Sequence, residues 1–183
     1  MENKLKLHDK TFKLFIPNQE IETAIDRVAA RLNSDYADCT NEDPAIIICT
    51  LNGAVIFAAE LLKRIQFPLL FKAAKLSSYE GTQSTGQVKT EVPLPDHLEG
   101  KRVIIVEDIV DTGTTIEALY RQLQERKVKD VRVCTLLLKP DVYKKNVPLD
   151  YVAMEIPNRF IVGFGLDYDE LGRNTKDIYV LDC

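Results

Sequence analysis

Three carboxylates stand close together in the segment VIIVEDIVDTGTT, which occupies residues 103–115. Glu107 and Asp108 directly follow an apolar run, and Asp111 comes three residues later. Carboxylate oxygens accept hydrogen bonds, so their natural partners are hydroxyl groups or a divalent cation. The three acids therefore predict a site for a ligand that carries hydroxyl groups.

A place for an anion follows the acids along the chain, at Thr112, Gly113, Thr114 and Thr115. A helical pattern begins there, and the N–H groups and dipole of a helix N-terminus attract anions. Small side chains let a phosphate approach the backbone. A ribose 5-phosphate would satisfy both the acids and this helix start. The alternative interpretation is that the acids are exposed on a surface turn, where they cap the helix and bind no ligand. The phosphate loop GxxxxGK[ST] and the dinucleotide fingerprint GxGxxG are both absent.

The elements that must position this segment alternate between strand and helix patterns. Apolar spacings of three and four predict a helix at residues 19–32. A strongly apolar run predicts another at 54–65, and a third is predicted after Thr114, where Thr114-x-x-Glu117 fits a capping box. Strands alternating with helices predict a parallel sheet covered on both faces, with ligands at the carboxyl ends of its strands. The polar segment 77–89 is predicted to be a loop. Strands are predicted at residues 11–16, 45–51, 68–76, 102–107, 131–138, 151–156, 160–164 and 178–181.

Composition and charge narrow the class of protein. A chain of 183 residues without a linker fits one domain, and 45% apolar with 28% charged residues is typical of globular proteins. The net charge of −4 argues against a general polyanion binder. No apolar run approaches the ~20 residues of a membrane span. The start MENKLKLHDK lacks the apolar stretch of a secretory signal. We therefore expect a cytoplasmic protein with no membrane or nucleic-acid partner.

Four stretches of the chain resemble known enzymes. Residues 103–115 resemble the phosphoribosyl pyrophosphate signature of the type I phosphoribosyltransferases. Three others resemble the hypoxanthine (6-oxopurine) phosphoribosyltransferases, in the family's order: LNGA at 51–54, SSYEGTQSTG at 77–86, and LLLKP through EIPNRFIVGFGLDYDELGR at 136–173. The resemblance implies an α/β fold of the type I phosphoribosyltransferase kind, with a central, mostly parallel sheet flanked by helices. It implies a single domain over residues 1–183, with a core at about 40–140 and a small hood over the base site from about 1–16 and 150–183.

The resemblance also implies roles for the acidic segment. Glu107 and Asp108 are expected to hold the ribose 2- and 3-hydroxyls, directly or through magnesium. Asp111 is expected to lie beside N7 of a purine and to act as the general base that takes its proton. The 5-phosphate is expected to be held by Asp111, Thr112, Gly113, Thr114 and Thr115.

For the purine itself, the resemblance implies contacts from Lys139, Phe160, Ile161 and Asp167. Lys139 would face the exocyclic oxygen, Phe160 would stack on the base, Ile161 would contact its edge through the backbone, and Asp167 would lie near a second magnesium. An ammonium group only donates hydrogen bonds, so Lys139 suits a 6-oxo group and meets the amino group of adenine badly. Alternative interpretations are a lysine that points into water and a phenylalanine that belongs to the core.

The implied pyrophosphate contacts come from three segments. They are Asn52 and Gly53, Ser78 and Tyr79 in a loop that closes over the site, and Arg173. Many family members carry Lys or Arg where this chain has Asn52, and the family's contact there is partly through backbone around an unusual cis peptide. The missing cation puts the strength of pyrophosphate binding in question.

The expected reaction transfers a phosphoribosyl group from phosphoribosyl pyrophosphate to hypoxanthine and/or guanine, giving IMP or GMP and pyrophosphate. Mg²⁺ is the expected cofactor, with Glu107, Asp108 and Asp167 as its ligands, and a homodimer or homotetramer is the expected assembly. A transferase that prefers xanthine is an alternative. Another is a regulatory protein that binds nucleotide together with RNA or DNA, which the acidic pI of about 5.3 disfavours.

Overall fold

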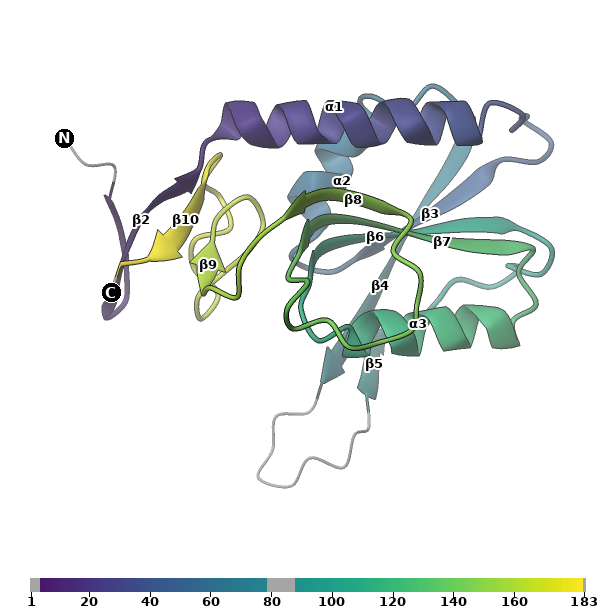
Figure 1. The fold of residues 1–183 in the computed structure, drawn as a ribbon. Coiled ribbons are helices and arrows are strands. Elements are labelled where there is room, and N and C mark those ends of the chain that lie inside the picture. The colour runs from purple at the N-terminus through teal and green to yellow at the C-terminus, as the bar shows by residue number, and fades with distance from the viewer. Residues whose placement is uncertain (1–3, 79–87, 183) are drawn as a thin grey trace.

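Two β-sheets and three helices make up residues 4–78 and 88–182, which the computed structural model describes (Figure 1). The larger sheet has six strands in the order β5-β4-β3-β6-β7-β8, and the smaller has four in the order β1-β2-β10-β9. Among the helices in these two ranges, none is long and apolar enough to cross a membrane. The larger sheet consists of β3 (Ala45–Thr50), β4 (Leu69–Ser78), β5 (Val88–Val92), β6 (Arg102–Val110), β7 (Asp130–Leu138) and β8 (Tyr151–Glu155).

The larger sheet is parallel from β4 through β8, and only β5 at its edge runs antiparallel to its neighbour. Helices α1 (Asn18–Asp35) and α2 (Val55–Leu62) cover one face, and α3 (Thr114–Glu125) covers the other (Figure 1). Alternate residues of β3 supply the two cores. Ile47 belongs to the apolar cluster under α1 and α2, while Ile46 and Ile48 belong to the cluster over α3. This two-sided burial explains the continuous apolar run of β3 and confirms the predicted fold class.

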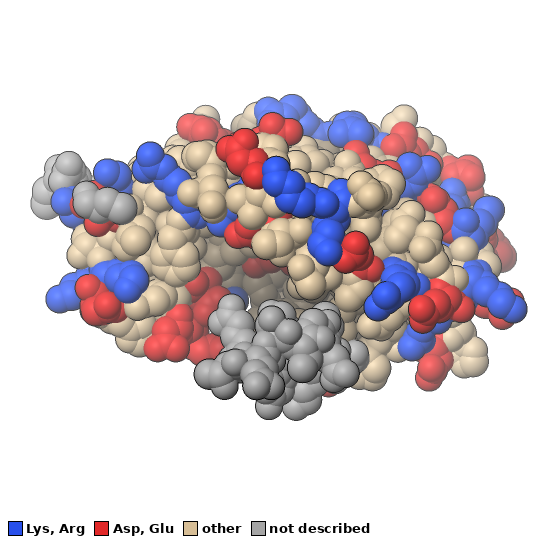
Figure 2. Space-filling model, turned by 60° about the horizontal axis from the view of Figure 1, so that its bottom comes forward, with Lys and Arg blue, Asp and Glu red and all other residues tan. Residues whose placement is uncertain are grey.

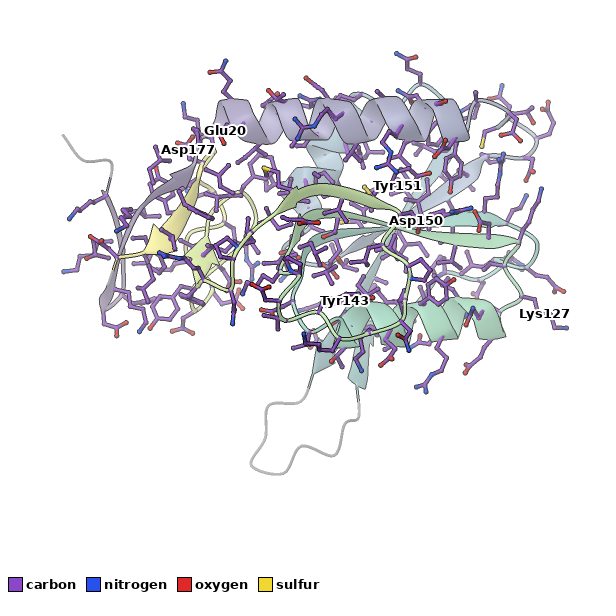
Figure 3. The ribbon with its side chains drawn as sticks, in the orientation of Figure 1. Glu20, Lys127, Tyr143, Asp150, Tyr151 and Asp177 are labelled. Carbon is purple, nitrogen blue, oxygen red and sulfur yellow. The ribbon has the colours of Figure 1, made fainter. Side chains whose placement is uncertain are left out.

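Helix α1 follows the predicted spacing closely. Ile21, Ile25, Val28 and Leu32 are all buried against the sheet. The helix extends three residues beyond the predicted end, to Asp35. At its start, the backbone N–H of Asn18 donates to Asp177 Oδ1 at 2.8 Å. Figure 3 shows Asp177 beside the first turn of α1, so this bond ties the C-terminal part of the chain to the helix.

The small sheet lies at one end of α1 (Figure 1). Its strands are antiparallel, and Leu7, Phe12, Val162 and Tyr179 form its own apolar cluster. The hood was expected to begin near residue 150, but β8 pairs with β7 at the edge of the larger sheet. The small sheet consists of β1 (Lys4–Leu7), β2 (Lys10–Ile16), β9 (Ile161–Val162) and β10 (Ile178–Leu181).

Several predicted boundaries differ from the structure for local reasons. The strand predicted at 102–107 continues to Val110, because Ile109 and Val110 still pair with Leu137 and Leu138 of β7. The strand predicted at 160–164 is only β9, since Gly163, Phe164 and Gly165 all have positive φ. Strands β1 and β5 were not predicted, because KLKL and VKTEV are short, carry few apolar residues and lie at sheet edges.

Candidate active site

A cavity of about 390 Å³ lies at the carboxyl ends of β3 and β6. Figure 2 shows the surface hollowed on this side of the molecule, with acidic side chains at the edge of the hollow. The cavity is bounded by the end of β3, by the acidic segment, by β4 and by a loop that joins β9 to β10. The residues predicted from the sequence that line this cavity are Asn52, Gly53, Glu107, Asp108, Asp111, Thr112, Gly113, Thr114, Thr115, Asp167 and Arg173.

The chain passes very close to Asp108 after β3. The Leu51–Asn52 peptide bond is cis, as the resemblance implied. A Cβ atom on Gly53 would lie 1.7 Å from Asp108 Oδ2, so any larger residue here would force the Asp108 carboxylate to move. Asp108 Oδ1 in turn accepts the N–H of Ile109 at 2.9 Å. The Gly53 backbone and the Asp108 carboxylate therefore share one wall of the cavity.

Glu107 is buried beneath this wall. Thr50 Oγ1 donates to Glu107 Oε1 at 2.6 Å, and the N–H of Asp108 donates to the same oxygen at 3.1 Å. Burial, and then the neighbouring Asp108 charge, raises the pKa of Glu107 well above its ordinary value. Thr50 was not predicted as a site residue, although a hydroxyl at the end of an otherwise apolar strand is a visible signal.

Asp111 is paired with Lys139. Lys139 Nζ lies 2.8 Å from Asp111 Oδ2, and the Lys139 backbone N–H donates to Val110 O at 3.0 Å. Lys139 is buried, so the interpretation that it points into water is wrong. Adjacent parallel strands β6 and β7 end side by side, which brings together two residues that are 28 positions apart.

The segment after Asp111 forms a turn that leads into α3. Gly113 is the N-cap residue with φ +83°, and Tyr143 fills the space in which its Cβ would stand. No side chain caps the helix, so the predicted capping box is wrong. Glu117 instead accepts a hydrogen bond from Lys145 Nζ at 2.6 Å. The first N–H groups of α3 have no acceptor within the helix, which leaves them available to an anion.

The loop between β9 and β10 contributes a carboxylate and a guanidinium. Arg173 Nη2 lies 2.9 Å from Asp167 Oδ1, and Arg173 Nη1 donates to Gly165 O at 2.9 Å. A Cβ on Gly165 would lie 2.0 Å from Gly53 O, so this loop packs directly against the end of β3. Within the described residues, no group of three or more His, Cys, Asp or Glu side chains could hold a metal ion by itself. Asp167 therefore does not form a ready-made metal cage with Glu107 and Asp108.

The remaining predicted residues lie outside the cavity lining or outside the described part of the chain. Phe160 is 44% exposed, which excludes the core interpretation; its ring lies tilted against the Phe12 ring and perpendicular to the Tyr168 ring. Ile161 is buried in β9. Ser78 is the last residue of β4. Tyr79 lies outside the described residues.

Two charged lining residues were not predicted, Lys75 and Glu170. Lys75 reaches the cavity because β4 pairs with β3, a register that the sequence alone does not reveal. Glu170 lies in the same loop as Asp167, to whose Oδ2 its N–H donates at 2.9 Å. An acidic run in a predicted ligand loop was the only signal for Glu170.

Comparisons with known proteins show the family to which the chain belongs. Residues 16–169 match the phosphoribosyl transferase domain, and the chain belongs to this family. Among its relatives is a hypoxanthine-guanine phosphoribosyltransferase from Mycobacterium tuberculosis, which is 40% identical over 90% of this chain and 83% of that protein. Another, from Staphylococcus epidermidis, is 38% identical over 96% of both chains. A crystal structure of a hypoxanthine phosphoribosyltransferase from Staphylococcus aureus superposes with a TM-score of 0.85 at 37% identity, covering 93% of this chain and 91% of that one.

Proposed function

We propose that this protein is a purine-salvage enzyme that transfers the 5-phosphoribosyl group of phosphoribosyl pyrophosphate to hypoxanthine and/or guanine. The relatives that match nearly the whole chain carry the names of such enzymes. The observation that carries the proposal is the Asp111–Lys139 pair: Asp111 lines the cavity directly before the start of α3, and the buried Lys139 ammonium group donates to it. A base-recognising pair and an anion site are thereby adjacent, as joining a purine to a sugar phosphate requires.

In the proposed reaction, purine N9 forms a bond to the anomeric carbon as the bond from that carbon to pyrophosphate breaks. The bonding electrons leave with pyrophosphate. Asp111 takes the proton from N7, which keeps the base nucleophilic. Lys139 donates to the 6-oxo group and also holds Asp111 in position before the base arrives.

The sugar phosphate is held by the segment after Asp111. The phosphate is proposed to bind the first N–H groups of α3 and the hydroxyls of Thr112, Thr114 and Thr115. Thr112 Oγ1 and Thr114 Oγ1 lie 3.2 Å apart, so both hydroxyls face the same space. Phe160 is proposed to stack on the purine with its exposed ring, and the backbone of Ile161 to contact the base edge.

The residues present fit a magnesium ion that arrives with the substrate. Mg²⁺ is usually held by one or two carboxylates together with substrate oxygens. Glu107 and Asp108 offer such a pair. Glu107 is buried beside this second acid and its pKa is raised, so a bound cation would reduce the repulsion between the two carboxylates. When bound, Mg²⁺ would neutralise charge on the leaving pyrophosphate. Asp167, the third expected ligand, is paired with Arg173 on the opposite wall and would have to exchange that partner.

The test is a panel of hypoxanthine, guanine, xanthine and adenine, each with phosphoribosyl pyrophosphate and Mg²⁺, with pyrophosphate release as the readout. We expect release with hypoxanthine or guanine and almost none with adenine, because Lys139 can only donate. Release with xanthine above both would favour the xanthine alternative. Salt-sensitive RNA binding without any release would favour a regulatory role.

We also propose that the enzyme is a homodimer or homotetramer. Val55 and Ile56 on α2, and Leu70 and Phe71 on β4, are large apolar residues that remain exposed. Exposed apolar groups of this kind are typical of association surfaces. A structure of the related Trypanosoma cruzi enzyme, with a TM-score of 0.88 at 33% identity, comes from work on its oligomeric state. The cytoplasmic location stays a prediction.

A further inference from the structure

The charges around the cavity are unevenly distributed. Among the described lining residues, the cations are Lys75 and Arg173. Arg173 lies on the wall formed by the β9–β10 loop, where Asp167 and Gly165 hold its guanidinium. On the wall formed by the end of β3, residue 52 is an uncharged asparagine. Five carboxylates also line the cavity: Glu107, Asp108, Asp111, Asp167 and Glu170.

A substrate diphosphate needs cations on more than one side in such an acidic cavity. Phosphate oxygens form their strongest hydrogen bonds with Lys and Arg. Asn52 can donate through its amide but brings no charge. A cation close to the end of β3 would therefore supply the positive charge that the diphosphate needs on this wall.

Lys75 lies at this place. In the parallel pair of β3 and β4, Thr50 is opposite Ala74, and the N–H of Leu51 donates to Ala74 O at 2.9 Å. Lys75 is the next residue of β4, so its backbone stands beside the cis peptide that precedes Asn52. The β4 pairing with β5 shifts in register directly after Lys75, which marks the same point.

The ammonium group of Lys75 is held but remains accessible. Its Nζ lies 2.7 Å from Glu91 Oε2, and the two side chains are 32% and 38% exposed. Ion pairs with this exposure contribute little free energy, typically ~0–1 kcal/mol. The ammonium has three donor hydrogens, so it can keep the Glu91 contact and still donate to a phosphate.

We infer that Lys75 is a pyrophosphate-binding residue that donates from Nζ to the diphosphate of phosphoribosyl pyrophosphate and to the pyrophosphate product. It supplies the positive charge that residue 52 does not. This inference rests on the proposed function, because the diphosphate belongs to the proposed substrate.

The experiment compares Lys75→Gln with Lys75→Arg and with a matched control, Lys72→Gln. Lys72 lies on the same strand and is exposed, but it does not line the cavity. In Lys75→Gln, KM for phosphoribosyl pyrophosphate should rise about tenfold, the scale of one charge-assisted hydrogen bond. KM for the purine and kcat should stay within about twofold, because the inferred role of Lys75 is limited to the diphosphate. Lys75→Arg should recover most of the affinity, and Lys72→Gln should match the wild type.

A calorimetric titration with magnesium pyrophosphate gives a second readout, in which the affinity of Lys75→Gln should fall by a similar factor. If Lys75→Gln does not fold, Lys75→Met replaces it, since methionine keeps an unbranched stem. An unchanged KM for phosphoribosyl pyrophosphate in an active variant overturns the inference. So does an equal rise in both KM values that Lys75→Arg fails to reverse, because that pattern belongs to a structural role. A wild-type protein that releases no pyrophosphate with any base refutes the proposed function instead, and the titration still tests Lys75.

Discussion

The pairing of Asp111 with Lys139 joins a carboxylate of the cavity lining to a buried ammonium group. The 2.8 Å contact joins the proposed general base to the proposed reader of the 6-oxo group. Each therefore depends on the other for its orientation. A change at Asp111 is expected to affect the chemical step, while a change at Lys139 is expected to affect the choice of base as well.

Replacing Asp111 with asparagine tests the first role. Asp111→Asn keeps the size of the side chain and an oxygen for Lys139 but removes the proton acceptor. We expect kcat to fall by ~10²-fold or more, the usual contribution of a general base. Binding of IMP or GMP, followed by calorimetry, should change much less. Near-normal turnover of this variant would remove Asp111 from the proposed mechanism.

Glu107 offers a test of stability against pH. Its pKa in the folded state is raised, above all by burial, so the folded protein favours the protonated carboxyl. The stabilising effect of that proton is fully present below the ordinary pKa of 4.5 and is lost as pH rises through the raised value. We therefore expect Glu107→Gln to raise the melting temperature of the free protein at pH 8 and to impair turnover. The gain should shrink as pH falls toward 4.5. A lower melting temperature at pH 8 would contradict this account of the buried carboxyl.

At the scale of the elements, helix α1 packs on the edge of the larger sheet. Two tyrosines at this contact allow its polar interactions to be tested by a matched pair of variants. Tyr151 of β8 points toward α1 (Figure 3), and its hydroxyl donates to Asp35 Oδ2 at 2.7 Å. Tyr36, just after α1, has a buried hydroxyl for which the described residues supply no hydrogen-bond partner. Both rings are almost fully buried. The two tyrosines thus differ mainly in whether the hydroxyl is satisfied.

We expect the same substitution to have opposite effects at these positions. Tyr151→Phe should lower the free energy of unfolding by ~1 kcal/mol, because it removes a hydrogen bond and leaves Asp35 without that donor. Tyr36→Phe should be neutral or stabilising, since it removes a polar group whose burial is unfavourable. Urea denaturation of the two variants measures both values. Equal destabilisation would mean that the Tyr36 hydroxyl has a partner in solution.

The elements also show what could be predicted from the sequence. β3 and α1 were found because burial on both faces, or on one stripe, leaves a clear apolar pattern. The end of β6 was missed, since Glu107 and Asp108 interrupt that pattern while the pairing with β7 continues. Within the site, Asp111 and Lys139 were predicted from motifs. Thr50 and Lys75 were not, because their roles depend on which strands become neighbours and in what register.

At the scale of the whole molecule, we propose that the chain forms one domain in which the small sheet packs against the part that contains the larger sheet. The Asn18–Asp177 bond and the contact of Gly165 with Gly53 join the two. The apolar cluster of the small sheet is limited to a few residues, such as Leu7 and Phe12. A cluster of this size is too small to stabilise a separate unit.

The proposed self-association is a property of the same scale. We expect Phe71→Asp to shift the protein toward a smaller species, because a charge on an apolar interface is costly to bury. Sedimentation velocity at several concentrations measures this shift. Leu14→Asp is the control, since Leu14 is also an exposed apolar strand residue but lies on the small sheet. If Phe71→Asp sediments as the wild type does, β4 is not part of an interface between subunits.

The contact between Gly165 and Gly53 has a consequence for any redesign of this enzyme. The two segments contact each other through their backbones, and a Cβ on Gly165 would lie only 2.0 Å from the Gly53 carbonyl oxygen. Because no side chain separates them, a substitution to a smaller residue cannot create space there. An engineer who shifts the β9–β10 loop outward to admit a bulkier nucleobase also withdraws support from the opposite wall. Variants selected for a new base specificity should therefore also show a changed affinity for pyrophosphate. The two properties should change together.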